Sequence, residues 1–312
     1  MRRMPRHLVI GAGPTGSSLA EHLLASGETV RVVTRSGRVP TAGAEGIALD
    51  ATDPEALARA ADGATVIYDC ANPGPYPRWE TGWPPLAAAA LSAAERTGAV
   101  LVTMGNLYVY GPVDGLISPD LPLAATSRTG RLRARLWRDA LAAHEAGLVR
   151  TTEVRASDYL GPTVSAEHGL IARYGASALA GRSARVIGDP DAPHSWTYVP
   201  DIGHTLEVLG RDERAWGRAW HVPTNPPVTI RALLEQLTAS AGVDGPVVRR
   251  MPRAALTALA PFVPLLGHVR ELRYQFDRPF VIDAAETTEV FGIRPSPWAE
   301  VVERTAAEWS SR

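Results

Sequence analysis

The feature that most constrains the fold is a glycine-rich segment near the N-terminus, Gly11-Ala12-Gly13-Pro14-Thr15-Gly16. It follows a short apolar run and opens a helical pattern, so it has the form G-x-G-x-x-G between a strand and a helix. In this context the first glycine allows a tight turn, the second lets the backbone approach a pyrophosphate, and the third lets helix and strand pack closely. Unpaired N–H groups at the helix start would bind the phosphates. The segment therefore predicts a dinucleotide site containing Gly11, Gly13, Pro14, Thr15 and Gly16.

The first half of the chain alternates short apolar runs with helical patterns, which is typical of βαβ units and a parallel sheet. We expect strands at residues 7–10, 29–34, 46–49, 65–70, 99–104 and 150–155. Helices are expected at 15–26, 54–61, 85–96 and 131–146. Asp53 and Pro54 have the residue types favoured at the cap and first position of the second of these helices.

These elements predict an α/β fold with a doubly wound parallel sheet of the Rossmann type, formed by residues 1–161 and 194–223. After Gly161-Pro162 the pattern loosens. A smaller, discontinuous α+β substrate domain is expected over 162–193 and 224–312. Asp201 is expected to cap a helix where the chain returns to the first domain.

The end of the second strand indicates which dinucleotide is bound. An NAD site usually carries Asp or Glu about 20 residues beyond the glycines, whereas this chain has Thr34-Arg35-Ser36-Gly37-Arg38. Because arginine pairs well with phosphate oxygens, Arg35 and Arg38 favour the 2′-phosphate of NADP(H) over NAD(H). The alternative is that both are solvated loop charges. Further cofactor contacts are predicted at strand ends, from Asp50, Ala51, Ala71 and Asn72.

Composition excludes several kinds of chemistry. All 32 basic residues are arginine, so there is no lysine for a Schiff base, a P-loop or a catalytic tyrosine. The net charge of −1 gives no general basis for binding nucleic acid or a membrane surface. The single cysteine, Cys70, cannot form an internal disulfide. We expect a cytoplasmic protein that acts on a small-molecule substrate.

Five segments resemble the extended short-chain dehydrogenase/reductase superfamily, in its epimerase/dehydratase branch. They are VIGAGPTG, ALDATDPEAL, LVTMGNLYVYGP, EVRASDYLGP and HSWTYVPDIGHTL. The resemblance covers nearly the whole chain, and it implies that the last two segments lead into and out of a substrate domain. It also implies hydride transfer at a nicotinamide, with a proton passed to or from the substrate oxygen.

The same resemblance implies a Ser or Thr after the strand at 99–104, followed by a Tyr and a Lys spaced Y-x-x-x-K. Aligned on Val109-Tyr110-Gly111, the hydroxyl position falls on Asn106. Ser127 and Arg131 occupy the tyrosine and lysine positions. The usual catalytic residues are therefore absent from the places where the family has them.

Three interpretations follow. In the first, the site is rebuilt: Asn106 holds the substrate oxygen, Tyr108 or Tyr159 supplies the proton, and Arg131 binds the nicotinamide ribose. The protein would then reduce a carbonyl, an imine or an activated double bond of a small bacterial secondary metabolite. In the second, it is a catalytically silent NADP(H)-binding regulator or partner protein. In the third, the fold serves a non-redox cyclase, dehydratase or epimerase.

The substrate pocket is expected at the carboxyl ends of the strands. Its predicted aromatic and imidazole contacts are Tyr76, Trp79, Trp83, Tyr159, His194 and Trp196. The segment 72–85 is expected to be an ordered loop rich in proline and aromatic residues. No metal site is expected, because the histidines show no metal-binding spacing. The helices at 85–96 and 131–146 would pair in a homodimer, as in related proteins.

Overall fold

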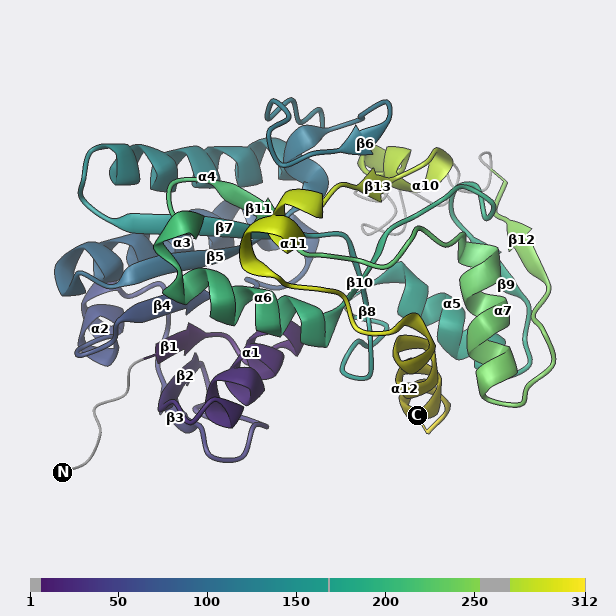
Figure 1. Ribbon diagram of the computed structural model, residues 1–312, viewed down its shortest axis with the longest axis horizontal. Coiled ribbons are helices and arrows are strands. Elements are labelled where there is room, and N and C mark those ends of the chain that lie inside the picture. Colours follow the sequence, from purple (N-terminus) through teal and green to yellow (C-terminus); the bar gives the residue numbers. More distant parts are fainter. Residues whose placement is uncertain (1–6, 168, 253–269, 312) are drawn as a thin grey trace. The chain divides into compact units, whose positions relative to one another are not determined.

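The computed structural model describes residues 7–167, 169–252 and 270–311 (Figure 1). The chain forms two compact units. The first unit contains Met1–Val109, Arg128–Arg155 and Ile202–Val222. The second unit contains Tyr110–Ser127, Ala156–Asp201 and Pro223–Arg312.

Seven strands form the sheet of the first unit, in the spatial order β11-β7-β5-β4-β1-β2-β3. They are β1 (His7–Ile10), β2 (Val30–Thr34), β3 (Glu45–Ala48), β4 (Val66–Asp69), β5 (Val100–Asn106), β7 (Arg150–Ala156) and β11 (Ala219–His221). The pairs β1–β2, β1–β4, β2–β3, β4–β5 and β7–β11 are parallel. The strand order reverses beside β1, which confirms the predicted doubly wound Rossmann-type sheet.

Helices cover both faces of this sheet. They are α1 (Pro14–Ala25), α2 (Pro54–Ala60), α3 (Trp79–Thr97), α4 (Arg128–Glu145) and α6 (Val199–Arg211). Ile67 of β4 is buried with Leu57 of α2 and Leu86 of α3. The next residue, Tyr68, points to the opposite face, where a Cβ on Gly210 of α6 would lie 2.5 Å from its hydroxyl.

Several predicted helix boundaries are confirmed, and the start of α3 is corrected. Asp53 caps α2, since its carboxylate accepts hydrogen bonds from the N–H groups of Glu55 and Ala56 at 3.0 Å. The predicted loop at 72–85 is wrong over much of its length, because α3 begins at Trp79 and contains Pro84 and Pro85. The indole N–H of Trp79 donates to the Gly74 carbonyl at 3.0 Å and holds this first turn in place.

The described part of the second unit contains three short parallel ladders. They are β8 (Asp158–Leu160) with β10 (Trp196–Tyr198), β9 (Ala184–Val186) with β12 (Val248–Arg250), and β6 (Leu116–Ile117) with β13 (Val281–Ile282). Compared with the predicted substrate domain, this unit also contains residues 110–127, 156–161, 194–201 and 223. The reason is that β6 and β8 find their partner strands inside it.

Among the described residues of the second unit, five segments are helical. They are α5 (Leu170–Leu179), α7 (Ile230–Ser240), α10 (Tyr274–Asp277), α11 (Ala285–Phe291) and α12 (Trp298–Ser310). α5 and α12 pack closely, since a Cβ on Gly175 would lie 2.4 Å from the Trp309 ring. Asp201 is not a helix cap as predicted: it lies inside α6 and accepts hydrogen bonds from the N–H and hydroxyl of Ser296, at 3.0 and 2.6 Å. No described helix is long and apolar enough to cross a membrane.

Candidate functional site

The three glycines after β1 meet three different steric demands. Gly11 has a φ of +94°, and a Cβ there would lie 2.8 Å from the Ala71 Cα. A Cβ on Gly16 would lie 2.0 Å from the Gly11 carbonyl oxygen, so only glycine lets α1 pack this closely. Around Gly13 no atom lies within 4 Å of a Cβ position. The turn therefore has open space where a pyrophosphate would approach the start of α1, with Pro14 at its first position.

The turn after β2 exposes its arginines. Arg35 and Arg38 are exposed, and neither guanidinium forms an ion pair within the described part of the chain. The turn is closed by its hydroxyl groups: Thr34 Oγ1 donates to the Arg38 carbonyl at 3.2 Å, and Ser36 Oγ accepts from the Arg38 N–H at 3.3 Å. The two guanidinium groups are thus available to an anion, while the Thr34 and Ser36 hydroxyls hold the turn.

The other predicted cofactor residues lie at strand ends in the first unit. Asp50 is exposed, and its Oδ1 accepts from the N–H and hydroxyl of Thr52 at 3.0 and 2.8 Å. These hydrogen bonds hold the Asp50 pKa below its usual value, with a smaller contribution from the charge of Arg35. Ala71 packs against Gly11, and Ala51 is half-buried. Asn72 is exposed and its Oδ1 accepts from the Gly74 N–H at 2.9 Å.

Three predicted residues from two separate segments come together beside β5. The hydroxyls of Tyr76 and Tyr108 lie 2.9 Å apart and share a hydrogen bond. The Trp79 ring contacts both tyrosines, with centroid distances of 4.7 Å to Tyr76 and 6.3 Å to Tyr108. Trp79 is buried, whereas both tyrosines are partly exposed. The arrangement presents a phenol whose oxygen already has a second hydroxyl as its partner.

The two polar atoms of the Asn106 side chain, at the end of β5, have different roles. Its Oδ1 accepts from the backbone N–H of Tyr108 at 3.1 Å and so fixes the turn that positions this tyrosine. The amide nitrogen of the same side chain is a donor, suited to an oxygen atom of a substrate. The side chain that carries this donor belongs to a partly exposed residue.

The start of α4 differs from a Tyr–Lys site. Ser127 is buried, and Arg131 is exposed. Between them, Arg128 forms two hydrogen bonds with Glu80 of α3, at 2.9 and 2.7 Å. At the positions predicted for a tyrosine and a lysine, Ser127 therefore does not present an exposed hydroxyl, while Arg131 presents an accessible cation.

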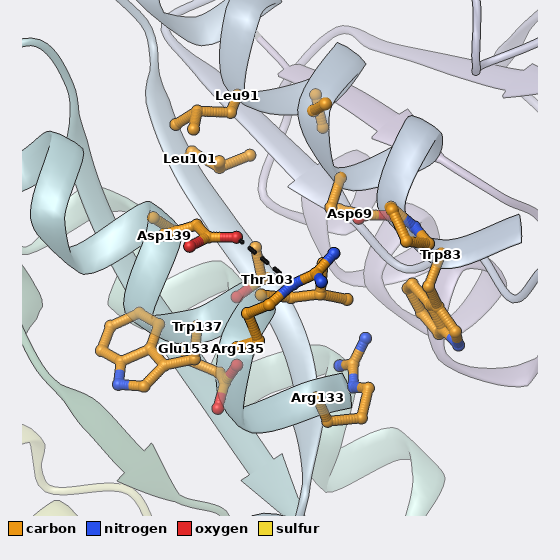
Figure 2. A pocket seen from close by; sticks show the side chains of 16 residues that line it. Asp69, Trp83, Leu91, Leu101, Thr103, Arg133, Arg135, Trp137, Asp139 and Glu153 are labelled. Carbon is orange, nitrogen blue, oxygen red and sulfur yellow. Dashed lines mark ion pairs between the residues drawn. The ribbon is translucent and has the colours of Figure 1, made fainter. Parts of the chain in front are cut away.

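A cavity of about 270 Å³ lies between α3, α4 and the strands of the first unit (Figure 2). Its wall includes Asp69 of β4 and Arg133 of α4, both buried. Arg133 donates to the Met104 carbonyl, and its guanidinium lies 4.0 Å from the centre of the Trp83 ring. Burial raises the pKa of Asp69 to about 6, although the charge of Arg133 and a hydrogen bond from Ala71 oppose the rise.

These two buried charged residues were missed from the sequence. Asp69 ends an apolar strand, which is a visible signal, but Arg133 lies in a helix with several other arginines. Only the burial pattern of α4 separates Arg133 from exposed neighbours such as Arg131 and Arg135. Trp83, predicted as a substrate contact, lies in α3 under this guanidinium.

The remaining predicted substrate residues lie in the second unit. His194 is 2% exposed, and its Nε2 lies 2.8 Å from Asp158 Oδ2. Its ring contacts Trp196 at 4.3 Å and stacks on Phe276 at 5.4 Å. Tyr159 is partly exposed on β8. His194 and Trp196 are thus packed within an aromatic cluster, whereas Tyr159 keeps an accessible edge.

Solved structures with a similar fold come from several bacteria. dTDP-glucose 4,6-dehydratase from Streptomyces venezuelae is 22% identical over 98% of this chain and 97% of its own, with a TM-score of 0.77. The dTDP-glucose 4,6-dehydratase from Bacillus anthracis is 20% identical, with 98% and 96% coverage and a TM-score of 0.80. UDP-glucose 4-epimerase from Thermotoga maritima is 17% identical, with 98% coverage of both chains and a TM-score of 0.78. At these identities the likeness concerns the fold.

Among curated proteins, a 91-residue stretch is 37% identical to the serine/threonine-protein kinase TOR of Arabidopsis thaliana. It spans 28% of this chain and only 3% of the kinase, so it carries no argument about activity. A family model gives a broader match, over residues 7–214. That range includes the glycine turn, the paired tyrosines and the start of α4. The chain belongs to the NAD dependent epimerase/dehydratase family.

Proposed function

We propose that this protein is an NADP(H)-dependent oxidoreductase that reduces a carbonyl, an imine or an activated double bond of a small metabolite at a rebuilt active site. The observation that carries the proposal is the hydrogen bond between Tyr76 and Tyr108, beside Asn106 and in the same unit as the glycine turn. Ligands of doubly wound sheets bind at the carboxyl ends of the strands. The glycine turn follows the carboxyl end of β1, and Asn106 is the last residue of β5.

The glycine turn fits a dinucleotide, because Gly13 leaves open space and Gly16 brings the start of α1 close to β1. The exposed Arg35 and Arg38 support NADP(H), since a 2′-phosphate would pair with their guanidinium groups. Structural relatives solved with bound NAD support a nicotinamide dinucleotide in general. When bound, this cofactor supplies the hydride.

The residues beside β5 supply the proton and hold the substrate. Tyr108 would donate its phenolic proton to the substrate oxygen or nitrogen as negative charge develops there. Tyr76 would donate to the Tyr108 oxygen and stabilise the phenolate left behind, across the 2.9 Å that separates the two hydroxyls. The Asn106 amide nitrogen would hold the same substrate atom, because its Oδ1 is already engaged by the Tyr108 N–H. Exposed Arg131 would bind the nicotinamide ribose.

A redox-neutral dehydration or epimerisation is the second candidate. It is favoured by the family to which the chain belongs and by neighbours that are sugar-nucleotide dehydratases and epimerases. In that case a product isomeric with the substrate, or lighter by one water, would form without any net consumption of NADPH.

The test of the reaction follows NADPH absorbance with a panel of carbonyl, imine and enone substrates. We expect oxidation of NADPH, and a fall in kcat of about 100-fold in Tyr108→Phe, the size of contribution expected from a general acid. Tyr110→Phe is the control, because the Tyr110 hydroxyl donates to the Pro119 carbonyl at 3.3 Å and has no proposed part in the reaction. Full turnover by Tyr108→Phe removes this residue as the acid, and no oxidation with any substrate overturns the proposed reduction.

The cofactor assignment is tested by titrating NADPH and NADH into the wild type, Arg35→Ala and Arg59→Ala. Loss of a charge-assisted hydrogen bond at Arg35 is expected to weaken NADPH binding by about tenfold or more and to leave NADH binding unchanged. Arg59 is also exposed but lies on α2, so its removal controls for the general loss of positive charge. Equal affinities for both dinucleotides, unaffected by Arg35→Ala, would contradict the assignment.

A further inference from the structure

α1 and α6 pack in direct contact within the first unit (Figure 1). A Cβ on Gly203 would lie 2.4 Å from Ser18 Oγ and 2.8 Å from the Ser18 carbonyl carbon, so a larger residue would not fit. Residues four apart share a helix face, which puts His22 one turn beyond Ser18 and Glu207 one turn beyond Gly203. The close approach of the two backbones therefore brings side chains of both helices together.

Two imidazoles and a carboxylate meet at this contact. His22, His204 and Glu207 each offer a donor atom, and these atoms all lie within 4.8 Å of one another. The two histidine rings are 5.6 Å apart between centroids, and Glu207 Oε2 lies 4.0 Å from His204 Nδ1. Tetrahedral Zn²⁺ with bonds of about 2.0–2.1 Å spaces its ligand atoms by about 3.4 Å. His204 has a 47% exposed side chain, so it can rotate to close this difference.

Neighbouring groups orient the carboxylate of Glu207, which is 9% exposed. Its Oε1 accepts from Ser26 Oγ at 2.6 Å and lies 3.3 Å from Nη2 of Arg211. This leaves Oε2 as the oxygen directed toward His204. Arg211 also lies 3.5 Å from Glu28 Oε1, so its positive charge is shared between two carboxylates. The local groups thus keep an excess of negative charge and hold one oxygen in place, as groups around metal ligands commonly do.

We propose that His22, His204 and Glu207 form a binding site for a divalent transition-metal ion, with Zn²⁺ as the best match. Imidazole nitrogens suit zinc, nickel and copper, whereas magnesium and calcium take oxygen ligands. The three side chains leave a fourth position for water. Because α1 begins at the glycine turn, the bound ion would fasten the dinucleotide-binding helix to α6. The histidines lie on distant segments, so their sequence spacing could not show this site.

The test uses the full chain after chelation of metals and dialysis. Zn²⁺ binding is measured by calorimetry, and Co²⁺ is titrated as a spectroscopic probe of coordination geometry. We expect a single equivalent of Zn²⁺ to bind and to raise the thermal unfolding midpoint. In His204→Gln and His22→Gln, binding should weaken by about tenfold or more, and the rise in midpoint should disappear.

Glu21→Gln is the matched control, because it removes an exposed carboxylate beside His22 and should bind Zn²⁺ as the wild type does. His204→Cys is expected to keep Co²⁺ binding and to add a thiolate-to-metal absorption band. Because His204 is exposed, its variants should unfold at the wild-type temperature in the presence of chelator. No Zn²⁺ binding by the wild type, or equal binding by His204→Gln and the wild type, would overturn the proposal.

Discussion

The turns after β1 and after β5 follow strands of the same parallel sheet but are built differently. After β1 the geometry depends on the absence of side chains, as the contacts around Gly11 and Gly16 show. After β5 it depends on side chains, namely the Asn106 amide and the Tyr108 hydroxyl. A site made of backbone can scarcely change without a steric clash, whereas a site made of side chains can be rebuilt with other groups. The two turns can therefore differ in how far they follow the family pattern.

The largest effect is expected from a pair of substitutions within the glycine turn. Gly16→Ala places a Cβ 2.0 Å from a backbone oxygen, and it should lower the free energy of unfolding by more than about 3 kcal/mol. Gly13→Ala meets no atom within 4 Å, so stability should change by less than about 1 kcal/mol while dinucleotide affinity falls. Denaturant unfolding and NADPH titration separate the two effects. Equal destabilisation by both variants would contradict the division between packing and binding.

The second prediction concerns Asp69 and the pH dependence of stability. Its pKa is raised from 3.8 to about 6 in the folded protein. The folded state therefore holds this proton more tightly than the unfolded state, and the group makes stability fall as pH rises from about 4 to about 6. Relative to Asp69→Asn, the wild type should lose at most about 3 kcal/mol of unfolding free energy across this range.

Urea unfolding at several pH values measures this difference. Asp139→Asn, which removes an exposed carboxylate of α4, is the control and should run parallel to the wild type. Arg133 stays protonated across this pH range. Its hydrogen bond to the Met104 carbonyl and its contact with the Trp83 ring therefore contribute to the free energy of unfolding by an amount that does not change with pH. A pH-independent difference between wild type and Asp69→Asn would show that the wall of the α3–α4 cavity is more hydrated than its burial indicates.

The smallest effect is expected at Arg128, which lies between Ser127 and Arg131, the two positions predicted for a tyrosine and a lysine. Arg128 and Glu80 are 65% and 53% exposed, so Arg128→Ala should lower the free energy of unfolding by less than about 1 kcal/mol. Turnover should stay within about twofold of the wild type, since this guanidinium joins two helices and has no assigned role in proton transfer. Arg96→Ala, which breaks the corresponding bidentate pair with Glu55, is the control. A large loss of turnover in Arg128→Ala alone would move the active site toward the start of α4.

Much of the first unit could be predicted because its signals are local. Each predicted strand ends within two residues of the observed one. For β1, β4 and β5 the reason is that apolar runs bounded by glycine or a capping residue mark buried parallel strands. The start of α3 could not be predicted in this way. Pro84 and Pro85 indicate a helix start, but contacts of Trp79 with Gly74, Tyr76 and Tyr108 extend the helix before them.

The candidate site likewise contains residues that local sequence signals predict and residues that they do not. The glycine residues could be identified because the turn, the approach of the pyrophosphate and the packing of helix on strand each require a glycine at a fixed position in the sequence. That Tyr76 and Tyr108 share a hydrogen bond depends on how the turn before α3 packs beside β5, and no spacing encodes it. The burial of Arg133 was hidden for a different reason: α4 is so rich in arginine that one inward-facing member has no distinctive neighbour in the sequence.

The interruption of the first unit by residues 156–201 has a consequence for its synthesis. β11, which pairs with β7, and most of α6, which packs on α1, are translated only after this interruption. A nascent chain that has reached Arg155 thus carries the complete glycine turn but has an open sheet edge and an uncovered helix face. We expect a fragment ending there to aggregate or to require a chaperone, because unpaired edge strands readily associate. The protein must emerge from the ribosome as far as Val222 before its dinucleotide-binding half can close.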